Sequence, residues 1–275
     1  GELGERTPFG PGGFEIASLS AGLAKAALMA VLAGRQRNAY ALSRPPGHHC
    51  LPAKPMGFCL LANIAIAIEA ALAAKAAERV AVIDWDVHHG NGTEAIFYER
   101  PDVLTISIHQ ERDYPPDTGS AADRGRGAGE GFNLNLPLAP GAGHDAYLRV
   151  MERVVVPAVR RFRPDVIVVA CGFDASGFDP LGRMMASSAT FGEMTGMVMA
   201  VADEVCSGRL VLVHEGGYSE VHVPFCGHAV LERLSGSPLR AGDPLLPRLN
   251  AQQPGGKAKD FHRAWVDELA MTHGF

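Results

Sequence analysis

The sequence predicts a single α/β domain built on a parallel sheet with helices on both faces. Five short runs consist almost entirely of apolar residues, as strands buried on both faces require. Stretches with apolar residues at helical spacing alternate with these runs, and that alternation is typical of doubly wound parallel sheets. The length of 275 residues, 47% of them hydrophobic, suits one large core better than two small domains.

The predicted elements follow one another in a regular order. The apolar runs that predict strands are Ala39–Leu42, Val80–Ile83, Val103–Ile108, Val166–Ala170 and Leu210–Val213. Helical spacing of apolar residues predicts helices over Ile16–Leu32, Cys59–Ala74, Ala146–Phe162, Phe191–Cys206 and Val223–Leu234. Residues 113–131 are rich in Gly, Pro and charge and predict a long surface loop. Residues 236–275 predict an extension that packs on the domain and ends in a helix over residues 260–271, without evident chemistry of its own.

Charge and hydropathy argue against two classes of partner. A net charge of -5 leaves no basic face for phosphate backbones, so we expect no nucleic-acid binding. The longest apolar stretch, Leu60–Ala74, is interrupted by Asn63 and Glu69 and is too short to span a bilayer. No signal peptide opens the chain, so we also expect no membrane association.

The cysteine pattern argues against thiolate zinc sites and disulfide frameworks. Five cysteines are scattered along the chain and none forms a CxxC pair. This pattern predicts a reducing, cytoplasmic setting.

Reactive side chains follow four of the five predicted strands. His48 and His49 come after the first strand, residues 84–89 after the second, Asp174 after the fourth and Tyr218 after the fifth. In open α/β sheets the carboxyl ends of the strands border the ligand-binding crevice. The sequence therefore predicts that these four segments meet at one site.

The segment after the second strand has the pattern of a metal site. In an extended chain Asp84, Asp86 and His88 project to the same side. Asp86 and His88 offer one oxygen and one nitrogen ligand, and Asp174 is the best third ligand, since a carboxylate at the end of an apolar strand needs a cation. Three protein ligands leave a tetrahedral zinc one position for water. The alternative is that these aspartates only cap helices and turns.

Two further motifs suit amide hydrolysis. His48 and His49 lie on a turn stiffened by prolines, and imidazole can serve as base and acid near neutral pH. The hydroxyl of Tyr218 can donate a hydrogen bond to the oxyanion formed when water attacks a carbonyl. The alternatives are a pair of surface histidines and a packed tyrosine with an exposed hydroxyl.

Together these motifs resemble those of class II histone deacetylases, and most closely the bacterial histone deacetylase-like amidohydrolases. The resemblance is collinear over residues 13–235 and rests on five segments: Arg44–His49, Met56–Cys59, Asp84–Gly92, Gly172–Asp174 and Glu215–Tyr218. It implies the arginase-deacetylase fold, a zinc ion on Asp86, His88 and Asp174, and a catalytic dyad of His48 and His49. The family also has a segment ahead of the position of Gly1, and we expect that segment to be absent here.

The resemblance also implies supporting residues. Asp84 would orient His48, and Asn91 would orient His49, whose imidazolium an amide stabilises less than a carboxylate does, so His49 is the expected principal base. A structural potassium or sodium ion would be bound by Asp84, Ser107 and Ile108, with further backbone carbonyls. A second monovalent cation would be bound near Phe97, Arg100 and Val103.

The same resemblance places the substrate. Phe58 and Tyr114 would form the walls of a tunnel for a long aliphatic stem, with Gly57, Gly216 and Gly217 beside the substrate. Leu181 stands where polyamine-specific relatives have a carboxylate, which argues against strict polyamine specificity. The expected activity is hydrolysis of acyl groups from a lysine-like small molecule, peptide or protein, by a homo-oligomer (dimer or tetramer).

Three other functions remain to be compared with this one. An N-acetylpolyamine amidohydrolase would use the same residues. A non-catalytic module that binds acyl-lysine would need a broken site, whereas here the ligands, the dyad and Tyr218 are present. A binuclear manganese enzyme of the arginase type is disfavoured because Ala175 and Ser176 follow Asp174.

Overall fold

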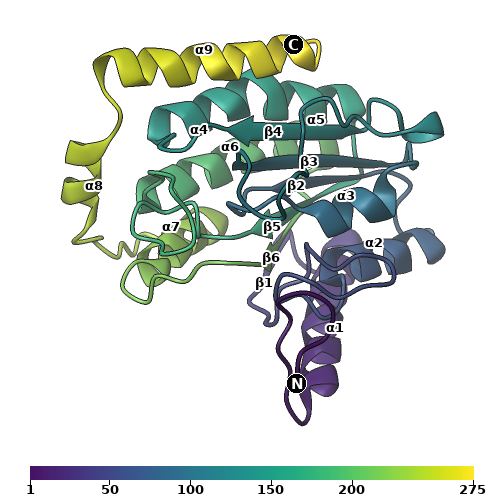
Figure 1. The fold of residues 1–275 in the computed structure, drawn as a ribbon. Helices are drawn as coiled ribbons and strands as arrows, with labels where there is room; N and C mark the ends of the chain where they lie inside the picture. Colours follow the sequence, from purple (N-terminus) through teal and green to yellow (C-terminus); the bar gives the residue numbers. More distant parts are fainter.

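The computed structural model describes all 275 residues and shows one six-stranded parallel sheet between two layers of helices (Figure 1). The strands lie in the order β1-β6-β5-β2-β3-β4. They are β1 (Asn38–Ala41), β2 (Val80–Asp84), β3 (Val103–Gln110), β4 (Asn133–Leu138), β5 (Val166–Cys171) and β6 (Leu210–His214). The strand order reverses between β2 and β5, so the sheet is doubly wound, as predicted, and its topological switch point lies at its centre.

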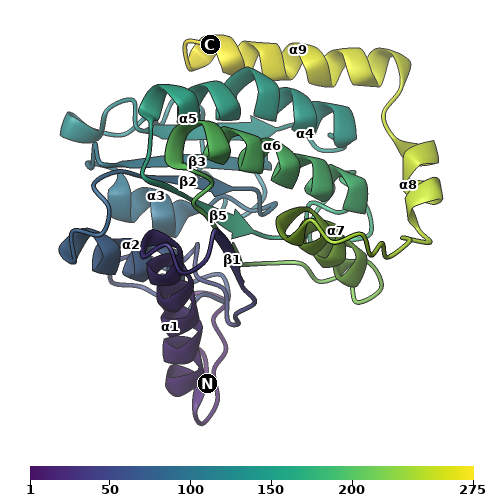
Figure 2. The ribbon, with the colours of Figure 1, turned by 180° about the vertical axis from the view of Figure 1, so that it is seen from behind.

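The helices divide into two layers, one on each face of the sheet (Figures 1 and 2). On one face lie α1 (Gly13–Leu32), α2 (Asn63–Ala73) and α3 (Asn91–Phe97). On the other lie α4 (His144–Val150), α5 (Val156–Phe162), α6 (Ser188–Cys206), α7 (Val223–Ser235) and α9 (Gly256–Thr272). Along β2, Val80 and Val82 pack on the first face and Ala81 and Ile83 on the second. This alternation explains why β2 is apolar at every position from Val80 to Ile83.

The structure contains three elements that the sequence did not predict. β4 alternates Asn and Leu and contains Pro137, which an edge strand tolerates. α3 is short, and α8 (Leu246–Gln252) lies inside the predicted extension. The predicted helix over 146–162 is interrupted by a π-helical segment, Met151–Val155, ahead of Pro157, which has no amide hydrogen to donate.

Helix α1 corrects the hydropathy analysis of the sequence. By length and composition it is the one helix of the chain apolar enough to cross a membrane, whereas the sequence analysis takes Leu60–Ala74 as the longest apolar stretch. Buried core helices pass the same test, and α1 packs against α2 through Ala24, Leu28 and Val31.

The C-terminal extension joins the core through α9. Val266 and Leu269 belong to the larger apolar cluster, and the indole of Trp265 donates a hydrogen bond to the carbonyl of Pro137 at 2.8 Å. Arg149 on α4 forms a two-pronged ion pair with Asp267 at 2.7 Å. The extension is therefore part of the domain's core.

We expect Leu269→Ala to lower the free energy of unfolding by about 2–4 kcal/mol, because it leaves a cavity in this core. Leu269 is 6% exposed. Met271→Ala, at a residue on the same helix that is 70% exposed, is the control and should change stability by less than about 0.5 kcal/mol. Urea denaturation measures both, and equal stability of the two variants would contradict the packing of α9.

Candidate active site

The predicted reactive residues meet at the carboxyl ends of the central strands. β2 ends at Asp84 and β5 ends at Cys171, and the two strands are hydrogen-bonded neighbours at the switch point. The loop after β2 therefore contacts the loop after β5, and the amide of Val87 donates a hydrogen bond to Oδ1 of Asp174 at 2.7 Å. Parallel pairing thus brings together two segments that are 87 residues apart in sequence.

Asp86, His88 and Asp174 form a compact set of metal-ligating groups. Nδ1 of His88 lies 3.0 Å from Oδ1 of Asp86 and 3.1 Å from Oδ2 of Asp174. All three residues are buried, and their ligating atoms lie within 4.8 Å of one another. Ligands about 2.0–2.2 Å from a tetrahedral zinc lie roughly 3.3 Å apart, so this set has the spacing that zinc requires.

The polar atoms of this set also fit a bound cation. Oδ2 of Asp174 is buried, and apart from its 3.1 Å contact with Nδ1 of His88 it has no polar partner. Burial and the charge of Asp86 raise the pKa of Asp174 to about 7. Burial disfavours a charge on His88, yet hydrogen bonds with Asp174 and Asp86 raise its pKa to about 11. Two buried carboxylates thus require positive charge between them, and a divalent metal supplies it.

Gly216 explains how the loop after β6 approaches so closely. Its amide donates a hydrogen bond to Oδ2 of Asp86 at 2.8 Å. A Cβ atom at this position would lie 2.2 Å from Oδ2 of Asp174. Only glycine fits here, and Gly217 follows at φ 128°, so the chain turns and places Tyr218 at the site.

His48 and His49 stack beside the ligand set with ring centroids 3.9 Å apart. Nδ1 of His48 lies 2.9 Å from Oδ2 of Asp84, and Nδ1 of His49 lies 2.8 Å from Oδ1 of Asn91. An amide oxygen accepts, so Nδ1 of His49 carries the hydrogen and Nε2 is free to take a proton.

The two imidazoles differ in charge. Burial disfavours protonation of His48, but the carboxylates of Asp86 and Asp84 raise its pKa to about 10. Burial and the positive charge of His48 hold the pKa of His49 well below its usual value. His49 is therefore the neutral member of the pair, able to accept a proton at Nε2, and His48 is the charged member.

Glu215 is a functional residue to which the sequence analysis gave no role. Its Oε2 accepts hydrogen bonds from the amides of Gly47 at 2.7 Å and His48 at 3.1 Å, so it holds the histidine turn in place. The only signal in the sequence was a carboxylate directly after an apolar strand. Its partners lie 167 and 168 residues away.

The burial of Glu215 is expected to make the free energy of unfolding depend on pH. Burial raises the pKa of Glu215 from 4.5 to about 7. Between these values the folded state binds more protons than the unfolded state, so this residue's contribution to stability falls as pH rises. Relative to Glu215→Gln, the wild type should lose up to about 3 kcal/mol of unfolding free energy between pH 4.5 and pH 7.

Urea denaturation of both proteins at pH 5 and pH 8 measures this difference. Glu220→Gln, at an exposed position nearby, controls for the loss of a carboxylate. A difference between wild type and Glu215→Gln that stays constant with pH would contradict the prediction.

A cavity of about 390 Å³ opens above the ligand set. Its walls include Gly57, Phe58, Tyr114, Leu181 and Tyr218, all predicted to border the substrate or to act on it. His49 and His88 form its floor, and the ring of His49 stands at 89° to that of Tyr114, 5.0 Å between centroids. Gly216 and Gly217 do not line this cavity; they lie behind it, beside the ligands and Phe173.

Three residues of the cavity wall were missed from sequence: Arg6, Asp113 and Pro116. Arg6 lies over the ring of Tyr114 at 5.3 Å. Oδ2 of Asp113 is buried without a hydrogen-bond partner, and Nε2 of His88 lies 3.9 Å from it. Asp113 and Pro116 lie in the predicted loop 113–131 and Arg6 lies ahead of the first predicted helix, where periodicity gives no signal.

The backbone of Tyr218 is held in place by Asp179. Its amide donates to Oδ2 of Asp179 at 2.7 Å, while Oδ1 of Asp179 accepts the amide of Leu181 at 2.9 Å. Its ring meets that of Phe58 edge to face, 5.9 Å between centroids. Tyr218 therefore lines the cavity beside Phe58.

The residues predicted to bind monovalent cations lie close together at each predicted position. Asp84 and Ser107 are paired across β2 and β3, Ile108 follows on β3, and a cavity of about 10 Å³ lies between the two strands and Asn135. Near the second predicted position, the carbonyl of Phe97 accepts the amide of Arg100 at 2.9 Å, and Val103 begins β3.

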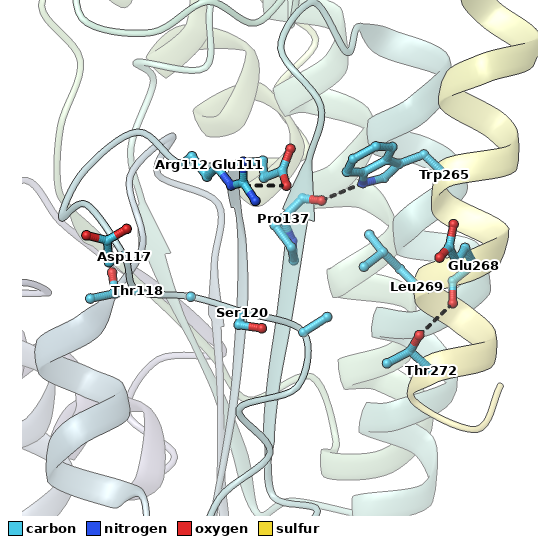
Figure 3. Close-up of a pocket in the computed structure, with 12 residues that line it drawn as sticks. Glu111, Arg112, Asp117, Thr118, Ser120, Pro137, Trp265, Glu268, Leu269 and Thr272 are labelled. Carbon is cyan, nitrogen blue, oxygen red and sulfur yellow. Dashed lines mark hydrogen bonds and ion pairs between the residues drawn. The ribbon is translucent and has the colours of Figure 1, made fainter.

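A larger cavity, of about 530 Å³, lies outside the active site between the loop 111–121 and α9 (Figure 3). Trp265 and Leu269 border it from the helix and Glu111 and Asp117 from the loop. None of the predicted site residues lines it.

Comparison with known proteins agrees with this geometry. Residues 2–234 match the family model of the histone deacetylase domain. The whole chain is 60% identical to a histone deacetylase-like amidohydrolase of Pseudomonas aeruginosa and covers 72% of it. It is 43% identical to histone deacetylase 8 of Arabidopsis thaliana, over 98% of this chain and 74% of that protein. The crystal structure of the HDA15 HD domain superposes with a TM-score of 0.81 at 35% identity, over 94% of this chain and 70% of the other.

Proposed function

Since this chain belongs to the histone deacetylase family, we propose that it is a zinc-dependent amidohydrolase that removes acetyl or related acyl groups from lysine-like amines. The observation that carries the proposal is the buried set of Asp86, His88 and Asp174, whose His88 lines a cavity walled by Phe58 and Tyr114. When bound there, zinc would supply a Lewis acid that polarises the amide carbonyl and makes water more acidic.

His49 transfers the protons of this reaction, and His48 provides electrostatic support. Nε2 of His49 takes a proton from the attacking water and later gives it to the leaving amine, which makes the amine a good leaving group. His48, held by Asp84, stabilises the negative charge that develops as the water attacks. Asn91 keeps the ring of His49 in the tautomer that leaves Nε2 free.

Tyr218 stabilises the oxygen of the substrate carbonyl. Its hydroxyl donates a hydrogen bond to that oxygen as negative charge develops on it. Burial and the charge of Asp86 raise the pKa of Tyr218 far above its usual value, so the phenol keeps its hydrogen. The rings of Phe58 and Tyr114 hold the apolar stem of the substrate and exclude water from it.

An acyl-lysine peptide is the substrate class that the cavity favours. The apolar side chain of Leu181 is 44% exposed at the rim and cannot pair with a second ammonium group. The runner-up is an N-acetylpolyamine, and the observation in its favour is the unpartnered carboxylate oxygen of Asp113 in the same wall.

Acetate release from an acetyl-lysine peptide and from N-acetylated polyamines, with and without a chelator, tests the proposal. We expect turnover that the chelator abolishes and zinc restores, with the peptide preferred. Preference for polyamines would support the runner-up, and chelator-insensitive turnover or no turnover on either substrate would contradict the proposal.

Three further expectations remain proposals. A structural potassium or sodium ion beside Asp84 and Ser107 would support the strand ends that carry the site. A cytoplasmic location suits five cysteines that are all unpaired and buried. A homo-oligomer suits the apolar outer face of α1, where Phe14, Ile16 and Leu19 are exposed.

A further inference from the structure

A buried chain of hydrogen bonds links the C-terminal extension to both loops that complete the active site. Oδ2 of Asp243 lies 3.0 Å from Nε2 of His222, and Nδ1 of His222 lies 2.5 Å from Oγ of Ser176. His222 is fully buried, and the side chain of Asp243 is only 3% exposed. We call these three residues the Asp243–His222–Ser176 relay.

Every polar atom of the relay has a defined partner. The carboxylate of Asp243 accepts, so Nε2 of His222 carries the hydrogen and Nδ1 accepts from the hydroxyl of Ser176. Oγ of Ser176 in turn accepts the amide of Phe178 at 3.2 Å. The direction of every hydrogen bond is therefore fixed, which makes the relay a rigid connection.

Two residues of the relay lie on the loops of the active site, and the third lies in the C-terminal extension. Ser176 comes two residues after the ligand Asp174, and His222 comes four residues after Tyr218. The Ser176–His222 bond therefore joins the loop that carries a metal ligand to the loop that carries the oxyanion donor. Asp243 lies beyond residue 234, where the match to the family model ends, in the segment between α7 and α8 (Figure 2).

We infer that Asp243, His222 and Ser176 are positioning residues that set the distance between the hydroxyl of Tyr218 and the metal ligands. None of the three lines the cavity, so they touch neither substrate nor reacting atoms. The inference rests on the proposed function for its kinetic readout. If the hydroxyl that stabilises the oxyanion is displaced by about 1 Å, the rate of amide hydrolysis falls by up to about 100-fold. The C-terminal extension, to which the sequence assigned no chemistry, thereby supports catalysis.

Ser176→Ala tests the relay by deleting one hydroxyl. We expect kcat to fall about 10-fold while KM stays within about two-fold, since the fault lies in transition-state contacts. In the cobalt-loaded protein we expect the visible absorption bands of the metal to shift or change intensity, because the loop of Asp174 is no longer held.

Ser188→Ala is the matched control. Ser188 is also buried, and its hydroxyl donates to the same Oδ2 of Asp243 at 2.6 Å, but it lies on α6 and its side chain forms no hydrogen bond with either catalytic loop. It should lose thermal stability like Ser176→Ala and keep kcat and the cobalt spectrum. Equal kcat and equal spectra in the two variants would overturn the inference.

Asp243→Ala tests the far end of the relay. It should lower kcat and change the cobalt spectrum in the same direction as Ser176→Ala. The double variant should be no slower than the slower single variant, because both changes break one connection. Multiplying effects would show independent roles and overturn the relay.

The cobalt spectrum separates this inference from the proposed function. If the wild type hydrolyses none of the acyl amines, the proposed function fails. The relay is then judged by whether Ser176→Ala, and not Ser188→Ala, changes the cobalt spectrum.

Discussion

Asp174→Ala is expected to abolish metal binding and amide hydrolysis together. It removes one of three ligands and leaves Asp86 and His88, which hold a divalent ion poorly without a third donor. We expect kcat/KM to fall by at least about 1000-fold and the bound zinc to fall from one per chain to a small fraction. Elemental analysis after dialysis measures the metal, and acetate release measures the activity.

The loss must be separated from damage to the loop, because Oδ1 of Asp174 also accepts the amide of Val87. Asp165→Ala is the matched control: Asp165 likewise accepts two backbone amides, of Glu78 and Arg79, but lies at the opposite end of β5. It should keep its zinc and its activity at temperatures where it is folded. Full zinc occupancy in Asp174→Ala would show that the metal is bound elsewhere.

Tyr218→Phe is expected to lower kcat by about 100-fold to 1000-fold while zinc stays bound. The change deletes one oxygen atom and keeps the ring that packs on Phe58. The hydroxyl contributes only when charge develops on the substrate oxygen, so KM should change little. Steady-state kinetics together with zinc analysis of the same preparation measure both.

Tyr147→Phe is the control for this prediction. The hydroxyl of Tyr147 is also buried without a hydrogen-bond partner, but it lies on α4 and outside the cavity. Its removal should leave kcat within about two-fold. If Tyr218→Phe behaves like Tyr147→Phe, the oxyanion is stabilised by another group.

The strands and the Asp86–His88 pair could be predicted because each depends only on residues that are close together in the sequence. A strand buried on both faces is mainly apolar, so β2, β3 and β5 could be recognised without knowledge of their neighbours. The ligands Asp86 and His88 are two residues apart on one extended segment, and alternation alone places them on one side. The order of strands and helices then implied that Asp174 and Tyr218 reach the same edge of the sheet.

Other elements gave no such pattern. β4 alternates Asn and Leu because the side-chain amides of Asn133 and Asn135 donate hydrogen bonds to a partly buried carboxylate, Glu94, on α3. That contact spans about 40 residues, and nothing near Asn133 in sequence indicates it. β4 and α3 were therefore missed together, because the polar residues of each are accounted for only by their hydrogen bonds to the other.

By itself, the sequence determined the α/β class and pointed to the candidate metal-ligating set and the histidine pair, because each follows from residues close together in the chain or from strand order. Only the tertiary structure decided which side chains support them. Glu215 holds the histidine turn from 168 residues away, and Asp243 reaches Ser176 through His222. Such supporting contacts are hydrogen bonds between distant loops, and a buried polar side chain shows its partner only when folding has removed water from both.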